Sequence, residues 1–95
     1  MKVARRPALR PRARRITTIV RDPALVERRH EQIFRAASRI FISRGYHATT
    51  VREIAHEAGL SLGSLYSYIR TKEDILFLVF QKLTNTLREN IRRAI

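Results

Sequence analysis

Residues 50–68 contain two short helical segments separated by a glycine, and this spacing most limits how the chain can fold. Thr50 and Glu53 fit a capping box, in which each side chain accepts a hydrogen bond from the other residue's backbone N–H group. The helix that begins there must be short, because Gly59 favours the positive φ that ends a helix. Ser61 then fits the N-cap of a second short helix, which we expect to reach Ile69. Two short helices joined by a tight turn have the span of a helix-turn-helix.

The residue types in this segment suit that geometry. Ala55 is small where the two helices would cross, and we expect Ile54, Ala58, Leu60 and Leu65 to face inward. The residues expected to remain outside on the second helix are Ser61, Leu62, Ser64, Tyr66, Ser67 and Tyr68. Small and hydroxyl-bearing side chains let a backbone approach a duplex and contact phosphates and base edges. Helix capping by the serines and core packing of one tyrosine remain open as alternatives.

The flanking segments are also predicted to be helical. Asp22 fits an N-cap, the proline after it fits the first helical position, and Gly45 favours a left-handed stop. Thr71 fits the N-cap of a fourth helix that continues to the end of the chain. The expected fold is therefore all-α: a three-helix helix-turn-helix domain over residues 22–71, followed by the start of a long fourth helix over residues 72–95.

Positive charge is concentrated at the start of the chain. The chain of 95 residues has 20 Lys and Arg against 8 Asp and Glu, a net charge of +12, and eight of the basic residues precede Asp22. Residues 1–21 have few apolar side chains to bury, so we expect a flexible basic arm. A solubilising tail is an alternative, and a transit peptide is a weaker one. Such a charge favours nucleic acid as a partner, and the scattered apolar residues of the arm argue against a membrane.

The sequence argues against an enzyme. It has no cysteine, and His30-Glu31 and His56-Glu57 lack the second histidine of a zinc protease motif. No phosphate-binding or nucleophile motif is present. We therefore expect no enzymatic activity, catalytic residue, metal site or cofactor, and we interpret all three histidines, including His47, as solvated surface residues.

Motifs across the centre of the chain resemble the signature of TetR-family transcriptional regulators. They are Thr49-Thr50-Val51-Arg52-Glu53-Ile54-Ala55, Ala58-Gly59-Leu60-Ser61, Gly63-Ser64-Leu65-Tyr66-Ser67-Tyr68 and Lys72-Glu73-Asp74, with Ile33–Tyr46 upstream. The resemblance covers residues 27–80. It implies a three-helix DNA-binding domain whose third helix enters the major groove, and a fourth helix that leads into a domain for small-molecule binding and dimerisation.

Carried over by position, the resemblance also implies the contact residues. Ser61 is added from the helix pattern above. The expected DNA-binding residues are then Thr50, Arg52, Ser61, Leu62, Gly63, Ser64, Tyr66, Ser67, Tyr68 and Lys72. Thr50 and Lys72 would hold phosphates, each at a helix N-terminus. Ser67 stands where the family often has an aromatic residue or histidine, Leu62 stands where relatives are often polar, and Gly63 has no side chain to read bases. We therefore expect base specificity to depend mainly on an arginine, a serine and a tyrosine, namely Arg52, Ser64 and Tyr66.

By resemblance, the function is that of a sequence-specific DNA-binding regulator in the cytoplasm, of the ligand-responsive repressor type. It would bind a palindromic double-stranded operator as a homodimer. The six apolar residues 75–80, and the stripe that continues through Leu83, Leu87, Ile91 and Ile95, exceed what three helices can bury. We expect either a second chain or a C-terminal ligand and dimerisation domain beyond this sequence to cover them. The alternative function is a non-specific nucleic-acid-binding protein of the nucleoid or RNA-binding type.

Overall fold

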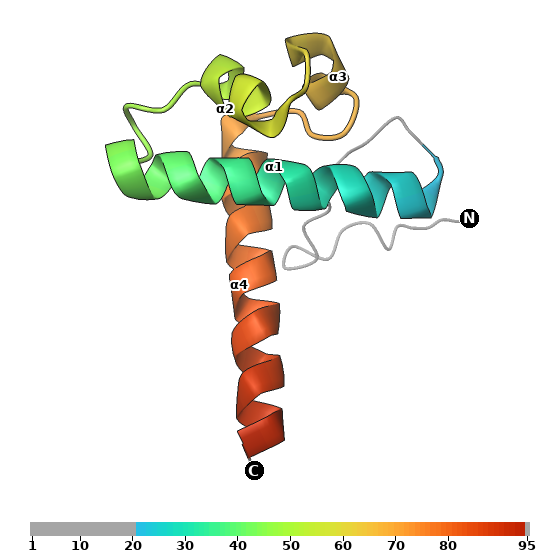
Figure 1. Ribbon diagram of the computed structural model, residues 1–95, viewed down its shortest axis with the longest axis vertical. Coiled ribbons are helices and arrows are strands. Elements are labelled where there is room, and N and C mark those ends of the chain that lie inside the picture. The colour runs from blue at the N-terminus through green and yellow to red at the C-terminus, as the bar shows by residue number, and fades with distance from the viewer. Residues whose placement is uncertain (1–20, 95) are drawn as a thin grey trace, which may run out of the picture.

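The computed structural model describes residues 21–94, which form four helices and no strand (Figure 1). The helices are α1 (Pro23–Arg44), α2 (Val51–Ala58), α3 (Leu62–Tyr66) and α4 (Lys72–Ala94). The expected all-α fold is confirmed over this part of the chain. Except for Arg21, which is exposed, the predicted basic arm lies outside the described residues.

The predicted cap of α1 is present, but its stop differs from the expected one. Oδ1 of Asp22 accepts from the backbone N–H of Ala24 over 3.0 Å. Gly45 ends the helix with φ 87° and ψ 156°, and its N–H donates to the carbonyl of Phe41 over 2.8 Å. The positive φ is as expected, whereas the ψ lies outside the left-handed helical region. Because almost only glycine adopts this combination of angles, the residue type is still explained.

The helix-turn-helix forms as predicted at its start and its corner, but α3 is shorter than expected. The Thr50–Glu53 capping box is complete, and Gly59 adopts left-handed angles of φ 78° and ψ 25°. α3 ends at Tyr66 instead of continuing to Ile69. The next backbone N–H, that of Ser67, donates to carbonyls three and four residues back, which tightens the chain into a turn. This turn carries the following residues toward the core.

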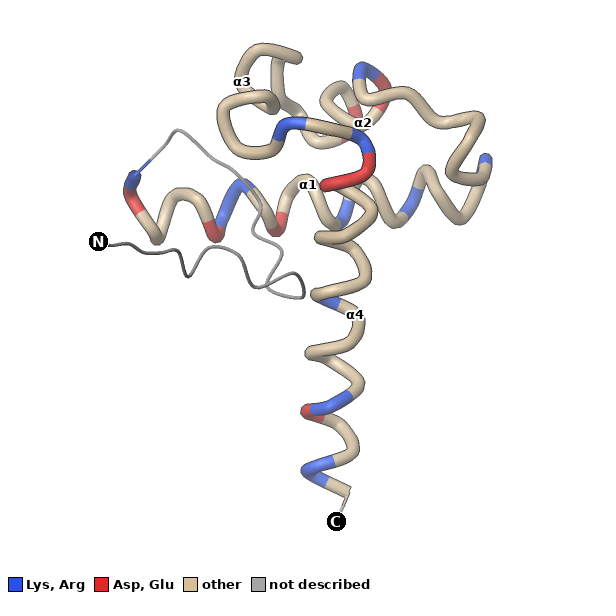
Figure 2. The backbone as a smooth tube through the Cα atoms, turned by 180° about the vertical axis from the view of Figure 1, so that it is seen from behind, with Lys and Arg blue, Asp and Glu red and all other residues tan. Residues whose placement is uncertain are grey.

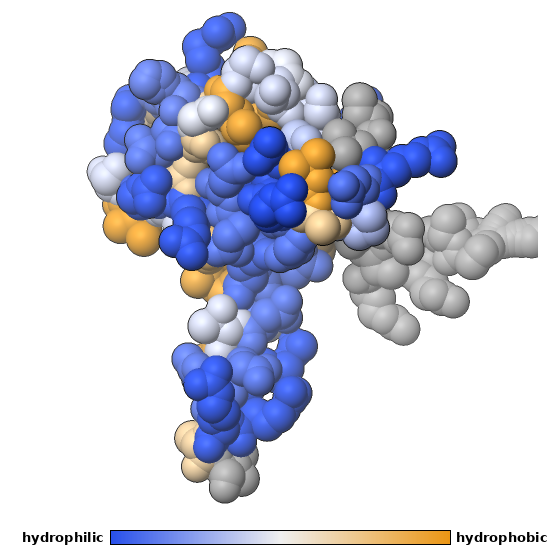
Figure 3. All heavy atoms as spheres, turned by 45° about the vertical axis from the view of Figure 1, so that its right-hand side comes forward, coloured by the Kyte–Doolittle hydropathy of each residue, from blue (hydrophilic) through white to orange (hydrophobic). Residues whose placement is uncertain are grey.

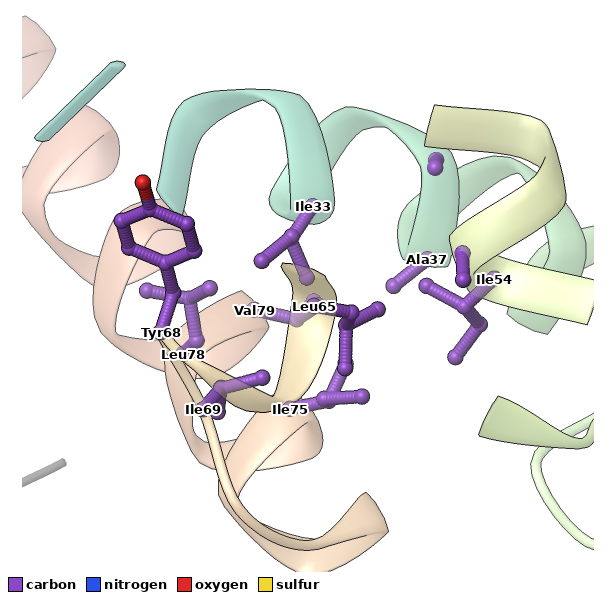
Figure 4. Close-up of a cluster of buried hydrophobic side chains, with 11 residues drawn as sticks. Ile33, Ala37, Ile54, Leu65, Tyr68, Ile69, Ile75, Leu78 and Val79 are labelled. Atoms are coloured by element: carbon purple, nitrogen blue, oxygen red, sulfur yellow. The ribbon is translucent and has the colours of Figure 1, made fainter. Parts of the chain in front are cut away.

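One core joins all four helices (Figure 4). Ile54, Ala55 and Leu65 are almost fully buried in it, while Ala58 and Leu60 are partly buried at its edge. The four positions predicted to face inward are therefore confirmed, and Ala55 is buried as well. The buried apolar residues are Ile33, Ala36, Ala37, Ile54, Ala55, Leu65, Tyr68, Ile69, Ile75, Leu78 and Val79. The first turns of α4 thus belong to the same core as α1, α2 and α3, which we call the three-helix head.

α4 crosses α1 and then extends away from the head (Figure 1). Along its free half Phe80, Leu83, Leu87 and Ile91 are between 51% and 60% exposed. The apolar stripe predicted beyond residue 80 is therefore uncovered in the described part of the chain. Between residues 21 and 94, no helix combines the length and apolar character needed to span a membrane.

Candidate nucleic-acid interface

α3 lies on the side of the head opposite the free half of α4 (Figure 1). Leu65 anchors it in the core, which leaves Gly63, Ser64 and Tyr66 exposed. Tyr66 is 45% exposed, an unusual position for a large side chain that a core could have used. Residues of near-neutral hydropathy form a pale patch at this end of the head, beside strongly hydrophilic side chains (Figure 3). The exposed face of α3 is thus small, polar and accessible to the backbone of a partner.

The predicted hydroxyl contacts divide into capping residues and a residue without a local partner. Thr50 Oγ1 accepts from the N–H of Glu53 over 3.1 Å, and Ser61 Oγ accepts from the N–H of Ser64 over 3.0 Å. Both hydroxyls therefore cap helices, that of Thr50 as predicted and that of Ser61 as the alternative interpretation held. Each still has its own proton to donate outward. The hydroxyl of Ser64 contacts no hydrogen-bonding group within residues 21–94.

Arg52 and Glu53 are neighbours in the first turn of α2, but only Glu53 has an ion-pair partner among the described residues. Glu53 Oε2 lies 2.7 Å from Nη1 of Arg44. The Thr50 backbone N–H, followed by the charge of Arg44, holds the pKa of the Glu53 carboxyl below its usual value. Arg52 is exposed and makes no ion pair with any described residue. Its charge is therefore available to an external anion, whereas that of Arg44 is compensated.

Lys72 is held at the start of α4 by the loop before α2. Its Nζ lies 4.3 Å from the centre of the Tyr46 ring and donates to the carbonyl of His47 over 3.5 Å. Tyr46 in turn packs against Phe41, with ring centres 5.3 Å apart. Burial, followed by the charge of Glu73, raises the pKa of the Tyr46 hydroxyl. This arrangement fixes a positive charge beside the N-terminus of a helix.

Three of the predicted contact residues are less accessible than expected. Tyr68 is only 7% exposed, so the expectation that it remains outside is wrong. Its ring lies at the edge of the core with the hydroxyl directed away from the other labelled side chains (Figure 4). Leu62 is half-buried and packs against the core, and Ser67 is half-buried with its hydroxyl donating to the carbonyl of Gly63 over 3.3 Å. The turn after α3 explains the positions of Ser67 and Tyr68, because it directs residues 67–69 back toward the core.

Sequence reasoning missed Arg70. This residue is exposed in the connection between α3 and α4, and no acidic side chain of the described segment pairs with it. Figure 2 shows basic positions in blue beside the red acidic turn at the start of α4. Lys72 is the first residue of this helix, and Glu73 and Asp74 follow it in the first turn. The sequence signal that could have identified Arg70 is its position, because it is a basic residue two positions before the predicted contact residue Lys72. Arg70 therefore adds an exposed positive charge to that of Lys72, in the connection that follows α3.

The interpretation of the histidines was wrong for His30. His47 and His56 are exposed, but His30 is half-buried and its Nε2 lies 2.9 Å from the carbonyl oxygen of Tyr68. A contact between residues 38 positions apart leaves no local pattern in a sequence. No group of three or more His, Cys, Asp or Glu side chains within residues 21–94 is arranged to hold a metal ion.

Residues 33–79 match the family model described as bacterial regulatory proteins, tetR family. The chain is 42% identical over 83 residues to the HTH-type transcriptional regulator HbdR of Aromatoleum sp. (strain CIB), covering 87% of this chain and 36% of that protein. It is 36% identical over 69 residues to the HTH-type transcriptional activator FasR of Mycolicibacterium smegmatis, covering 73% of this chain and 32% of that protein.

A third relative is the HTH-type transcriptional repressor KstR2 of Mycolicibacterium smegmatis. It is 39% identical over 54 residues, which cover 57% of this chain and 26% of that protein. The chain thus spans about a third of the length of the first two relatives and about a quarter of the third. No solved structure matches the chain significantly.

Proposed function

The chain belongs to the tetR family of bacterial regulatory proteins, and from this premise we propose that residues 22–71 are the sequence-specific DNA-binding domain of a transcriptional regulator. The observation that carries the proposal is the exposed polar face of α3 on a head whose core is otherwise complete. A helix presented in this way can enter the major groove of B-DNA.

In this proposal, Arg52, Ser64 and Tyr66 read base edges. Their support is exposure. Within the described residues, Arg52 lacks an ion pair, the Ser64 hydroxyl lacks a hydrogen-bond partner, and Tyr66 is 45% exposed. Arginine is suited to guanine, and a hydroxyl can pair with several bases. Gly63 contributes by allowing the backbone of α3 to approach the groove.

The remaining contacts hold the DNA backbone. Thr50 and Ser61 sit at the N-termini of α2 and α3, where free N–H groups and the helix dipole favour phosphate. Lys72 does the same at α4, and Arg70 adds a charge beside it. We include Tyr68 only through its hydroxyl, and Leu62 and Ser67 only through their exposed edges, because the structure buries the rest of these side chains.

We further propose that α4 continues into a dimerisation and effector-binding domain of a cytoplasmic homodimer. The support is the uncovered stripe on its free half, because apolar surface of this extent marks an interface. Two heads would then contact half-sites about one helical turn apart, on the order of 34–36 Å, in a palindromic operator. A small-molecule effector follows from the family resemblance alone.

The relatives do not agree on whether such a regulator represses or activates transcription. FasR is named an activator and KstR2 a repressor, so relatives of both kinds exist. Our expectation of a repressor therefore stays a prediction. The relatives reported above are all named as regulators, and nothing in the comparisons favours an enzyme.

The experiment that tests the proposal is selection of bound duplexes from a random library at moderate salt. A palindromic or half-palindromic consensus is the expected result. Binding that is strong at low salt, steeply salt-dependent and without a consensus would overturn the proposal in favour of a general nucleic-acid binder, because phosphate contacts alone carry no sequence information.

A further inference from the structure

Three side chains of α1 hold the C-terminal ends of both helices of the helix-turn-helix. Gln32 Nε2 donates to the carbonyl of Ala58, the last residue of α2, over 3.2 Å. His30 Nε2 lies 2.9 Å from the carbonyl oxygen of Tyr68, just beyond the end of α3. Arg29 joins the two contacts: its Nη1 donates to Gln32 Oε1 over 2.7 Å, and its guanidinium lies 6.0 Å from the centre of the Tyr68 ring. We call Arg29, His30 and Gln32 the α1 clasp.

The chemistry of the His30 contact is defined by its partner. A carbonyl oxygen only accepts hydrogen bonds, so the imidazole ring must donate from Nε2. The side-chain amide of glutamine can place its nitrogen near the position of Nε2, whereas the shorter asparagine places it near that of Nδ1. His30→Gln therefore keeps an N–H donor near the position of Nε2, whereas His30→Asn places the donor near the position of Nδ1.

α3 depends on contacts at its two ends. It has only five residues, and a helix so short has little stability of its own. Its last carbonyl groups accept hydrogen bonds from backbone N–H groups of the turn that follows it. Within the helix only Leu65 is fully anchored in the core, and α3 packs mainly against α2. The Ser61 cap fixes its start, and the contact of His30 with Tyr68 fixes the turn at its end. Leu62 packs against the core at the start of the helix, and Tyr68 and Ile69 are buried directly after it. The His30 contact therefore acts together with this packing to fix the orientation of α3.

The α1 clasp lies just before the segment that matches the family model. Its three residues precede Ile33, where the match to the family model begins. Gln32 and His30 contact backbone carbonyl groups at the ends of α2 and α3, so both side chains can act on sequence recognition through these two helices.

We propose that His30 and Gln32 are positioning residues, which set the angle at which α3 is presented to DNA by hydrogen bonding to the ends of both helices of the helix-turn-helix. This inference rests on the proposed DNA-binding function. Loss of the His30 donor should lower discrimination between the selected duplex and a scrambled duplex by about three- to tenfold, the effect of one net hydrogen bond.

The test compares His30→Gln, His30→Asn and His30→Leu in the full chain. Affinity is measured for the duplex selected by the wild-type chain and for its scrambled version. Gln32→Leu is compared with Gln81→Leu, a matched control in which the same residue type is exposed on α4. Hydrogen exchange of the Ser67 and Tyr68 amides, which bond to carbonyls of residues 63–65, is followed without DNA.

We expect His30→Gln to keep discrimination and amide protection within about twofold of the wild type, and His30→Leu and His30→Asn to lose both. A glutamine variant as impaired as the leucine variant would overturn the inference, and so would a leucine variant indistinguishable from wild type. If His30→Leu does not fold, the glutamine and asparagine variants decide. A wild-type chain that selects no consensus refutes the proposed function instead, and amide exchange then decides on the α1 clasp alone.

Discussion

Nζ of Lys82 lies 3.3 Å from Oε1 of Glu31, at the point where α4 leaves the three-helix head. The same ammonium group also pairs with Glu27, one turn earlier on α1. Burial acts to lower the pKa of Lys82, but the hydrogen bonds and charges of Glu27 and Glu31 outweigh it and raise the pKa. One lysine thus joins the first helix to the part of α4 that extends beyond the head.

Lys82→Met should destabilise the fold modestly. The methionine keeps the apolar stem but leaves Glu27 without its ion pair and Glu31 with Arg35 alone. Because both glutamates are partly exposed, water compensates for most of the loss. We expect a decrease of about 0.2–1 kcal/mol in the free energy of unfolding. Urea denaturation measures it, with Arg88→Met on the exposed part of α4 as the control. An equal loss in both variants would show that the ion pairs contribute nothing.

Acid should weaken the fold partly through Glu53. Its pKa is lower in the folded chain than the ordinary 4.5, so the folded state binds fewer protons than the unfolded state in that range. The stabilisation is complete above the unfolded pKa and disappears as pH falls through the folded one. Glu53→Gln keeps a capping-box acceptor but removes the titration. Urea denaturation from pH 6 to pH 3 should show a smaller acid-induced loss in Glu53→Gln; an unchanged loss would contradict this origin.

Ser61 has two roles that substitution can separate. Ser61→Ala removes the cap of α3 and should cost about 1 kcal/mol of stability. Ser61→Asp keeps a capping oxygen but places a negative charge where we propose that a phosphate binds. The aspartate variant should therefore unfold near the wild-type midpoint yet bind duplex DNA much more weakly. Thermal unfolding and DNA titration on the same samples test this, and wild-type affinity in Ser61→Asp would remove Ser61 from the interface.

Arg52 and Ser64 should control sequence preference. Arg52→Ala is expected to reduce the difference in binding free energy between the specific and the scrambled duplex by about 1–3 kcal/mol, because a good arginine–base contact contributes this much to discrimination. Ser64→Ala should reduce it less. Neither change should lower the unfolding midpoint, because both side chains are exposed and make no ion pair or side-chain hydrogen bond within the described residues. Ser43→Ala, on the exposed end of α1, is the control for the serine; ratios equal to wild type in both variants would refute the assignment.

Arg70 should affect affinity without affecting preference. If it neutralises one phosphate, Arg70→Ala weakens binding to every duplex about equally and lowers the slope of log affinity against log salt by about one. Arg88→Ala removes the same charge from the free half of α4 and serves as the matched control. Slopes are measured between low and moderate salt. A change in the selected consensus would instead assign Arg70 to base recognition.

The sequence predicted those features of the fold that depend on neighbouring residues. The caps of α1, α2, α3 and α4 join residues no more than three positions apart: Asp22 with Ala24, Thr50 with Glu53, Ser61 with Ser64, and Thr71 with Asp74. The conformation of Gly59 depends on its own lack of a side chain. Such interactions form wherever the pattern occurs, so the helix starts and the corner of the helix-turn-helix were predicted correctly.

Tertiary structure decided where α3 ends and what its last residues do. Tyr68 is buried because α1 and α4 supply an apolar surface that no local pattern shows, and its carbonyl receives His30 from 38 residues earlier in the chain. The same long-range packing left Tyr66 and Arg70 exposed. Local hydrogen bonds therefore determined where the helices begin, whereas burial against distant segments determined which side chains of the recognition segment remain free to meet a partner.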